Sequence, residues 1–352
     1  KLLPWPGWGE ALLFKGVLAL SWIGVIRWCE RALANRPLWD RAVGLAIAAW
    51  LPLGPIQAVS EGHNDALVSA LIAGWICLRG SRPALAMLPL VASALCKYVT
   101  APLVLVELLV PGVRRSLGAR PVAKTLAIRV GLVGALTVLS FAPFFRSLEM
   151  FRSALRMRAW HFLTPREAML PFQTALDSLA GRHWGWIPVF VGMAPVLIAL
   201  PFVVAALFHR MRPQGMDPSR SHGGSVDPKG GWGRRLGIPS KDPEGALVLA
   251  GLAILMAILL SGLGHVWPWF VLWPIPLAVM IPGHGIARGW LALALAIPFG
   301  FGFVIHGSGL PDVLRFQLSS TACYLLAAAI FALVPIRWFP PTTAGTFPDG
   351  TG

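Results

Sequence analysis

Long apolar segments alternate along the chain with short polar or basic ones, and this pattern is the strongest indication of its fold. A helix that crosses a bilayer needs about 20 apolar residues. Several segments are shorter, and there we expect broken, tilted or re-entrant helices. The pattern predicts an all-α, polytopic integral membrane protein, with about eleven transmembrane or re-entrant helices in a single membrane domain over 1–352. The apolar segments are 11–28, 42–59, 66–79, 84–96, 99–111, 126–143, 187–208, 246–263, 268–283, 290–306 and 317–336.

The basic residues orient these segments. If Lys1 lies outside and every segment crosses, the short inside loops are rich in Arg and Lys, as the positive-inside rule requires. The long outside loop over 144–186 is an exception, and long loops follow that rule poorly. In an alternative interpretation, 84–111 is one helix kinked near Pro102, which would invert every segment after it.

The composition excludes a single soluble core. Hydrophobic residues make up 56% of the chain and charged residues 13%, against about 25% charged in an average soluble domain. The net charge of +15 is explained by basic residues retained in cytoplasmic loops, so we expect no nucleic-acid partner. Segment 209–245, rich in Gly, Pro, Ser and Arg, is expected to be a flexible cytoplasmic loop. The four Cys show no metal-binding spacing, so no zinc site is expected.

A polar cluster interrupts the apolar pattern at a predicted membrane boundary. It contains Glu61, His63, Asn64 and Asp65, and ionisable side chains at such a position are costly unless they have a role. We interpret them as a rim that orients a sugar, holds a divalent cation or positions an acceptor, with His63 and Asp65 as supporting catalytic residues. Capping of the helix that begins at Ala66 is the alternative for Asn64 or Asp65.

A lysine follows a long apolar run at the next outer turn, Lys97-Tyr98. Such a lysine must either extend to the membrane interface or find an anion. As a candidate substrate-binding residue it offers a point charge to a lipid-linked phosphate. The predicted topology puts Lys97 on the same face as His63 and Asp65, so the cation and the polar rim should converge.

Aromatic residues are dense between 265 and 274, where His265, Trp267 and Trp269 are accompanied by two prolines. Aromatic faces can stack on sugar rings and isoprenoid chains, which makes these three residues candidates for substrate binding. An interfacial aromatic belt is the alternative.

Basic and apolar residues also alternate in the outer loop 144–186, which predicts interfacial helices lying on the membrane. Arg156 and Arg158 are candidates to attract the phosphate headgroup of a lipid substrate. Plain anchoring at the membrane surface is the alternative.

The order of these motifs resembles polyprenol-phosphate-sugar-dependent glycosyltransferases of the GT-C superfamily. The similar parts are the GHND turn at 62–65, the KY turn at 97–98, the VWPWFVLWPIPLA segment at 266–278 and the LLFKGVLAL segment around Lys15. The likeness is greatest to bacterial α-mannosyltransferases and more distant to the catalytic subunit of GPI-anchor mannosyltransferase I.

This resemblance implies a GT-C-like fold in the bacterial cytoplasmic membrane, with an active site on the extracytoplasmic side. The donor would be a sugar, commonly mannose, on a polyprenyl phosphate, and the acceptor a glycan or lipid. Transfer would occur with inversion. The chemistry needs a carboxylate to deprotonate the acceptor hydroxyl and positive charge at the leaving phosphate.

The resemblance also places the principal catalytic Asp in an outer loop before the helix that matches 11–28, and therefore upstream of Lys1. We accordingly expect the chain to be an N-terminally truncated fragment. Two other hypotheses remain open. One is a polytopic transporter or lipid flippase, which broken helices would suit. The other is an inactive, truncated membrane scaffold.

Overall fold

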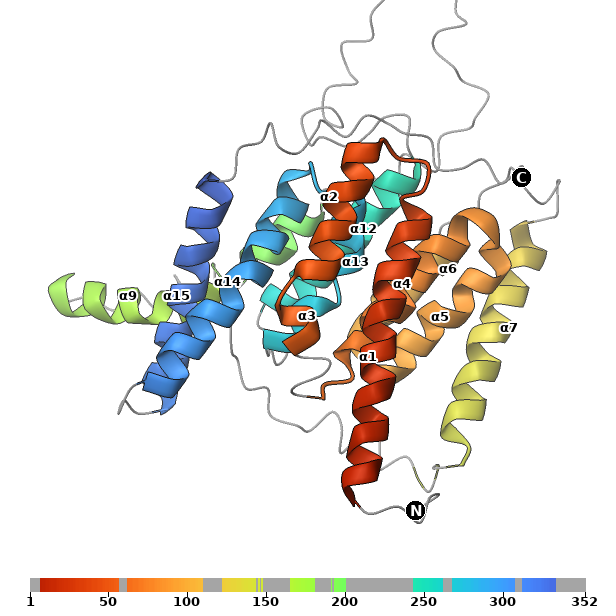
Figure 1. Cartoon of the computed structure of the whole chain (residues 1–352), viewed down its shortest axis with the longest axis horizontal. Coiled ribbons are helices and arrows are strands. Elements are labelled where there is room, and N and C mark those ends of the chain that lie inside the picture. The colour runs from red at the N-terminus through yellow and green to blue at the C-terminus, as the bar shows by residue number, and fades with distance from the viewer. Residues whose placement is uncertain are drawn as a thin grey trace, which may run out of the picture.

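The computed structural model describes residues 7–56, 62–109, 122–143, 145, 147, 165–180, 191, 193–200, 243–261, 268–307 and 312–333. In these residues every regular element is a helix and none is a strand, which confirms the predicted all-α class (Figure 1). The elements are α1 (Gly7–Ala32), α2 (Leu38–Trp50), α3 (Leu53–Pro55), α4 (Asp65–Ser81), α5 (Pro83–Cys96), η2 (Tyr98–Thr100), α6 (Ala101–Leu109), α7 (Val122–Phe141), α9 (Pro165–Ala180), α12 (Pro243–Leu260), η4 (Pro268–Leu272), α13 (Ile275–Met280), α14 (Gly285–Gly307) and α15 (Asp312–Leu333).

One predicted apolar segment, 42–59, is wrong as a single helix. Helix α2 ends at Trp50, and the three-residue α3 follows it. Leu51 is extended, with φ −62° and ψ 109°, because a residue before proline avoids the helical region. Pro52 also lacks the N–H that would continue the helix.

The alternative of one kinked helix over 84–111 is also wrong. Helix α5 ends at Cys96, and Lys97 is extended at φ −148° and ψ 112°. Helix α6 then runs back beside α5, because Glu107 near its end reaches Arg79 near the end of α4. The chain therefore reverses at Lys97.

Helices α1 and α4 lie side by side and run in the same direction (Figure 1). Gly24 of α1 lies against Ala70, and Trp28, one turn further, lies against Gly74. The side chain of Lys15, near the start of α1, lies against Gly62, just before α4. The beginnings of both helices therefore meet at one end of the bundle.

The polar side chains gather at the two ends of this bundle. We name the first the Asp65 end, which contains the 62–65 turn and the Lys97 turn. The second, the arginine end, contains Arg79 and the Arg27–Glu30 ion pair at 3.0 Å. Arg79 lies fourteen positions after Asp65 in α4, and at 1.5 Å per position this is about 21 Å.

The centre of the bundle is formed by α12, α13 and α14. Every residue of α13 is buried. The indole N–H of the fully buried Trp290 in α14 donates to the carbonyl oxygen of Val271 at 3.0 Å, which fixes η4 against the core. This contact matters for the site because η4 leads directly to Trp273.

Helix α1 exposes much of its apolar surface. It buries a narrow stripe that includes Leu18, Trp22 and Val25, while Leu12 and Leu20 are exposed. In the described residues, α1 is the one helix that is long and apolar enough to cross a membrane, by length and composition. Several shorter apolar helices accompany it. The count of eleven membrane helices therefore stays a prediction.

The close approach of α3 to α1 gives a first testable prediction. A methyl group at Gly54 would overlap the ring of the buried Trp22. Gly54→Ala should therefore lower the free energy of unfolding by about 1–3 kcal/mol, as overpacking usually does. Thermal unfolding in lipid nanodiscs measures this. Gly16→Ala is the matched control because no atom lies within 4 Å of the added methyl group, and equal stability of the two variants would contradict the packing.

Candidate active site

The 62–65 turn places Asp65 at the first position of α4. Gly62 has φ +73°, a left-handed conformation that glycine adopts without steric cost. Asn64 is the N-cap residue, but no side chain caps the helix. The contact that Asn64 makes with the first turn is through its backbone, whose carbonyl oxygen accepts from the N–H of Leu67 at 3.0 Å. The capping interpretation is therefore wrong for both Asn64 and Asp65.

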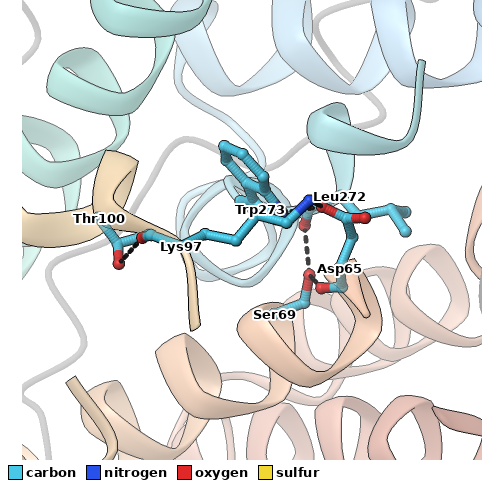
Figure 2. Close-up of polar contacts among 6 residues, drawn as sticks. All are labelled: Asp65, Ser69, Lys97, Thr100, Leu272 and Trp273. Atoms are coloured by element: carbon cyan, nitrogen blue, oxygen red, sulfur yellow. Dashed lines mark hydrogen bonds and ion pairs between the residues drawn. The ribbon is translucent and has the colours of Figure 1, made fainter. Parts of the chain in front are cut away.

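The Asp65 carboxylate binds two donors that come from distant parts of the chain. Its Oδ1 atom accepts from Lys97 Nζ at 2.9 Å and from the indole Nε1 of Trp273 at 2.6 Å (Figure 2). Asp65 is fully buried. Its second oxygen, Oδ2, is also buried and has no hydrogen-bond partner. The carboxylate thus joins α4, the Lys97 turn and the chain after η4.

Lys97 is held by its own turn. Its backbone N–H donates to the carbonyl oxygen of Ser93 at 2.9 Å, and its own carbonyl oxygen accepts from the Thr100 hydroxyl at 3.2 Å. Its ammonium lies 4.4 Å from the centre of the Phe270 ring and 5.2 Å from that of Trp273. The Lys97 side chain keeps 22% of its surface exposed. The lysine is therefore the open side of the ion pair.

Ser69 ties the same turn of α4 to η4. Its Oγ lies 2.9 Å from the carbonyl oxygen of Asp65 and 2.9 Å from that of Leu272 (Figure 2). The hydroxyl has one proton, which it donates to one of these carbonyls at a time. This contact supports the approach of Trp273 to Asp65.

Aromatic rings lie around the ion pair and pack against one another. His63 stacks on Trp269 with ring centres 3.8 Å apart and planes at 13°. Phe270 stacks on Trp273 at 4.4 Å, and the Lys97 ammonium lies over Phe270 as well. Of the three residues predicted to stack on a sugar ring, Trp269 is described, and it stacks on His63.

The predicted site residues divide into three groups. His63, Asp65, Lys97 and Trp269 come together, and Asn64 lies in the same turn. Tyr98 is 83% exposed, so most of its surface lies outside the packed cluster. The remaining candidates lie outside the described residues; they are Glu61, Arg156, Arg158, His265 and Trp267.

Sequence reasoning missed two members of the cluster, Trp273 and Phe270. Both lie in the 265–274 segment, from which His265, Trp267 and Trp269 were chosen as candidates, and no pattern in the sequence distinguishes these three from Phe270 and Trp273. A signal for a tryptophan such as Trp273 was available. A buried carboxylate requires hydrogen-bond donors, and the indole N–H of tryptophan can only donate.

The described residues contain no group of three or more His, Cys, Asp or Glu side chains arranged to hold a metal ion. A divalent cation as cofactor therefore stays a prediction that these residues do not support.

Comparison with protein-family models, with curated proteins and with solved structures finds no match. The resemblance to GT-C glycosyltransferases consequently depends on the chain's own motifs and on the contacts between them.

A second charged cluster lies at the arginine end and was not predicted. Arg79 Nε donates to Glu107 Oε2 at 2.7 Å, and Arg129 Nη1 donates to the Glu107 carbonyl at 2.8 Å and lies 3.5 Å from its Oε1. All three residues are buried. The cluster joins α4, α6 and α7, about 21 Å along α4 from Asp65.

The Trp273 contact gives a second prediction. Trp273→Phe keeps an aromatic ring but removes the N–H that binds Asp65, so unfolding free energy should fall by about 1.5–3 kcal/mol, as for hydrogen bonds to charged groups. Trp75→Phe is the matched control, because Trp75 is equally buried and its Nε1 has no hydrogen-bond partner. Chemical unfolding of both variants measures the difference, and a larger loss in Trp75→Phe would contradict the assignment.

Proposed function

We propose that this chain is a membrane glycosyltransferase that moves a sugar, with mannose as the first candidate, from a polyprenyl phosphate to a glycan or lipid hydroxyl. The reaction would take place on the extracytoplasmic side of a bacterial cytoplasmic membrane. The observation that carries this proposal is the Asp65–Lys97 contact at 2.9 Å, because it joins the two turns on which the resemblance depends. The third motif of the resemblance, the segment 266–278, contacts Asp65 through the indole N–H of Trp273.

The surface of the bundle supports a location in the membrane. Exposed apolar side chains occur on several helices, and soluble monomers rarely expose large apolar patches. Helix α1 is long and apolar enough to cross a bilayer, and shorter apolar helices accompany it in the described part of the chain. The arginine end would face the cytoplasm by the positive-inside rule, and the Asp65 end would face outward.

The chemistry assigns different roles to the residues at the Asp65 end. In an inverting transfer, the acceptor oxygen forms a bond to the anomeric carbon as the bond to the phosphate oxygen breaks. The acceptor proton needs a base. Asp65 is fully buried and holds two donors, so we assign it to positioning Lys97 and Trp273. His63 is only partly buried and lies at the same turn.

Transfer of radiolabelled sugar from polyprenyl-phosphate mannose or glucose to endogenous lipid acceptors tests this function. The full-length protein, reconstituted in proteoliposomes, should release polyprenyl phosphate together with a labelled product. Absence of transfer from either donor by folded protein would contradict the proposal.

A transporter is the second candidate, because the buried Arg79–Glu107–Arg129 cluster is a feature that membrane transport proteins often use. The same proteoliposomes distinguish the two functions. Accumulation of labelled sugar inside the vesicles, without a glycosylated product, would favour transport.

A further inference from the structure

We infer that the Asp65–Lys97 pair binds the hydroxyl groups of an uncharged sugar ring, and not the phosphate of the donor. This inference rests on the proposed function, since it names the part of the substrate that this site recognises. It departs from the sequence interpretation, in which Lys97 offered its charge to a lipid-linked phosphate.

The first argument is the charge of the site. The Lys97 ammonium already contacts a carboxylate at 2.9 Å and lies over the rings of Phe270 and Trp273. The ion pair is neutral as a whole. A phosphate bound to Lys97 would stand next to the fully buried carboxylate of Asp65, where like charges repel strongly in a medium of low dielectric. An uncharged ligand meets no such repulsion.

The second argument is the unsatisfied oxygen of Asp65. Oδ2 is buried and has no hydrogen-bond partner. A carboxylate oxygen accepts hydrogen bonds only, and such a group in a native structure requires an explanation. A ligand that donates a hydrogen bond would satisfy it, whereas a phosphate with its full charge has no proton to donate.

The third argument is that donor and acceptor groups stand side by side. An ammonium has three N–H groups, and Asp65 takes one of those of Lys97. A sugar hydroxyl both donates and accepts, so one hydroxyl can donate to Asp65 Oδ2 while it or its neighbour accepts from Lys97. A metal ion fits less well, because the described residues offer no group of three ligands and the ammonium would repel it.

The approach to the pair is from the lysine side. Lys97 keeps 22% of its side-chain surface exposed, whereas Asp65 is completely covered. His63 and Asn64 are also partly exposed at the same turn. A ring that enters here would meet Lys97 first and reach Asp65 Oδ2 as local side chains move aside.

Saturation-transfer-difference NMR on the protein in nanodiscs tests this inference with methyl α-D-mannopyranoside and methyl phosphate as separate probes. The methyl glycoside should bind the unmodified protein, and Asp65→Asn and Lys97→Met should each weaken its binding at least tenfold. Asp40→Asn, which changes another buried carboxylate, should leave binding unchanged. Thermal unfolding of each variant shows whether it is folded, and Lys97→Met carries the test if Asp65→Asn is not.

Two results would overturn the inference. One is binding of methyl phosphate that is lost in Lys97→Met, with no binding of the glycoside. The other is no binding of either probe, which would mean that Oδ2 is satisfied by a buried water only. These results are separate from the transfer assay. Transfer without glycoside binding would contradict the inference and support the proposed function. Glycoside binding without transfer would support a sugar site at the Asp65–Lys97 pair and contradict the proposed function.

Discussion

Asp65→Asn is expected to reduce sugar transfer at least about 100-fold, which corresponds to about 2.7 kcal/mol of lost transition-state stabilisation. The substitution keeps the shape of the side chain but removes the charge that holds Lys97 at 2.9 Å. Its amide oxygen can still accept from Trp273, whereas the amide nitrogen that replaces the unpartnered Oδ2 cannot accept a hydrogen bond from a sugar hydroxyl. Initial rates of transfer in proteoliposomes measure the loss.

Stability should change together with activity, because breaking a largely buried ion pair leaves one partner uncompensated. We expect Asp65→Asn to cost about 3 kcal/mol of unfolding free energy. A double-mutant cycle with Lys97→Gln isolates the pair, and the double variant should lose less than the sum of the single losses, by about 0.5–3 kcal/mol. Asp40→Asn is the control at the opposite end. Additive losses within about 0.3 kcal/mol would contradict the contact.

Glu107→Gln is expected to be the most destabilising substitution at the arginine end. The Glu107 carboxylate is 1% exposed and lies between Arg79 and Arg129, which are also buried. Without its charge, the two buried guanidinium groups lose this carboxylate, and removal of one partner from a buried ion pair typically costs about 3–5 kcal/mol. Urea or thermal unfolding in nanodiscs measures this change.

A matched substitution separates burial from charge. Glu30→Gln removes a carboxylate that also pairs with two arginines, Arg27 at 3.0 Å and Arg41 at 3.4 Å. The Arg27 side chain is 72% exposed, so water replaces the lost contact. The melting temperature should therefore fall much further in Glu107→Gln than in Glu30→Gln. Similar shifts in the two variants would contradict the buried cluster.

Hydrophobic segments predicted the helices well because burial or lipid exposure acts along the whole length of an element. Helices α4 and α5 agree closely with 66–79 and 84–96. The break after Trp50 was missed, although Pro52 and Pro55 are local signals that act against a continuous helix. The prediction relied on the apolar content of the segment, whereas in the structure the helix ends before Pro52.

The contacts of the site were predictable only in part. Alternation of helix direction places the 62–65 turn and Lys97 at one end, which is why their convergence could be expected from the sequence. The hydrogen bond from Trp273 to Asp65 joins residues 208 positions apart, and it depends on how η4 packs on α14. The pairing of Arg79 with Glu107 likewise depends on the reversal of the chain at Lys97.

The most direct test of the account measures the transfer of labelled mannose from polyprenyl-phosphate mannose by the full-length protein in proteoliposomes. The unmodified protein is compared with its Asp65→Asn and Asp40→Asn variants. The account predicts an inverted glycosidic product from the unmodified protein, a loss of at least about 100-fold in Asp65→Asn and little change in Asp40→Asn. No product from the folded, unmodified protein, or full transfer by Asp65→Asn, would contradict it.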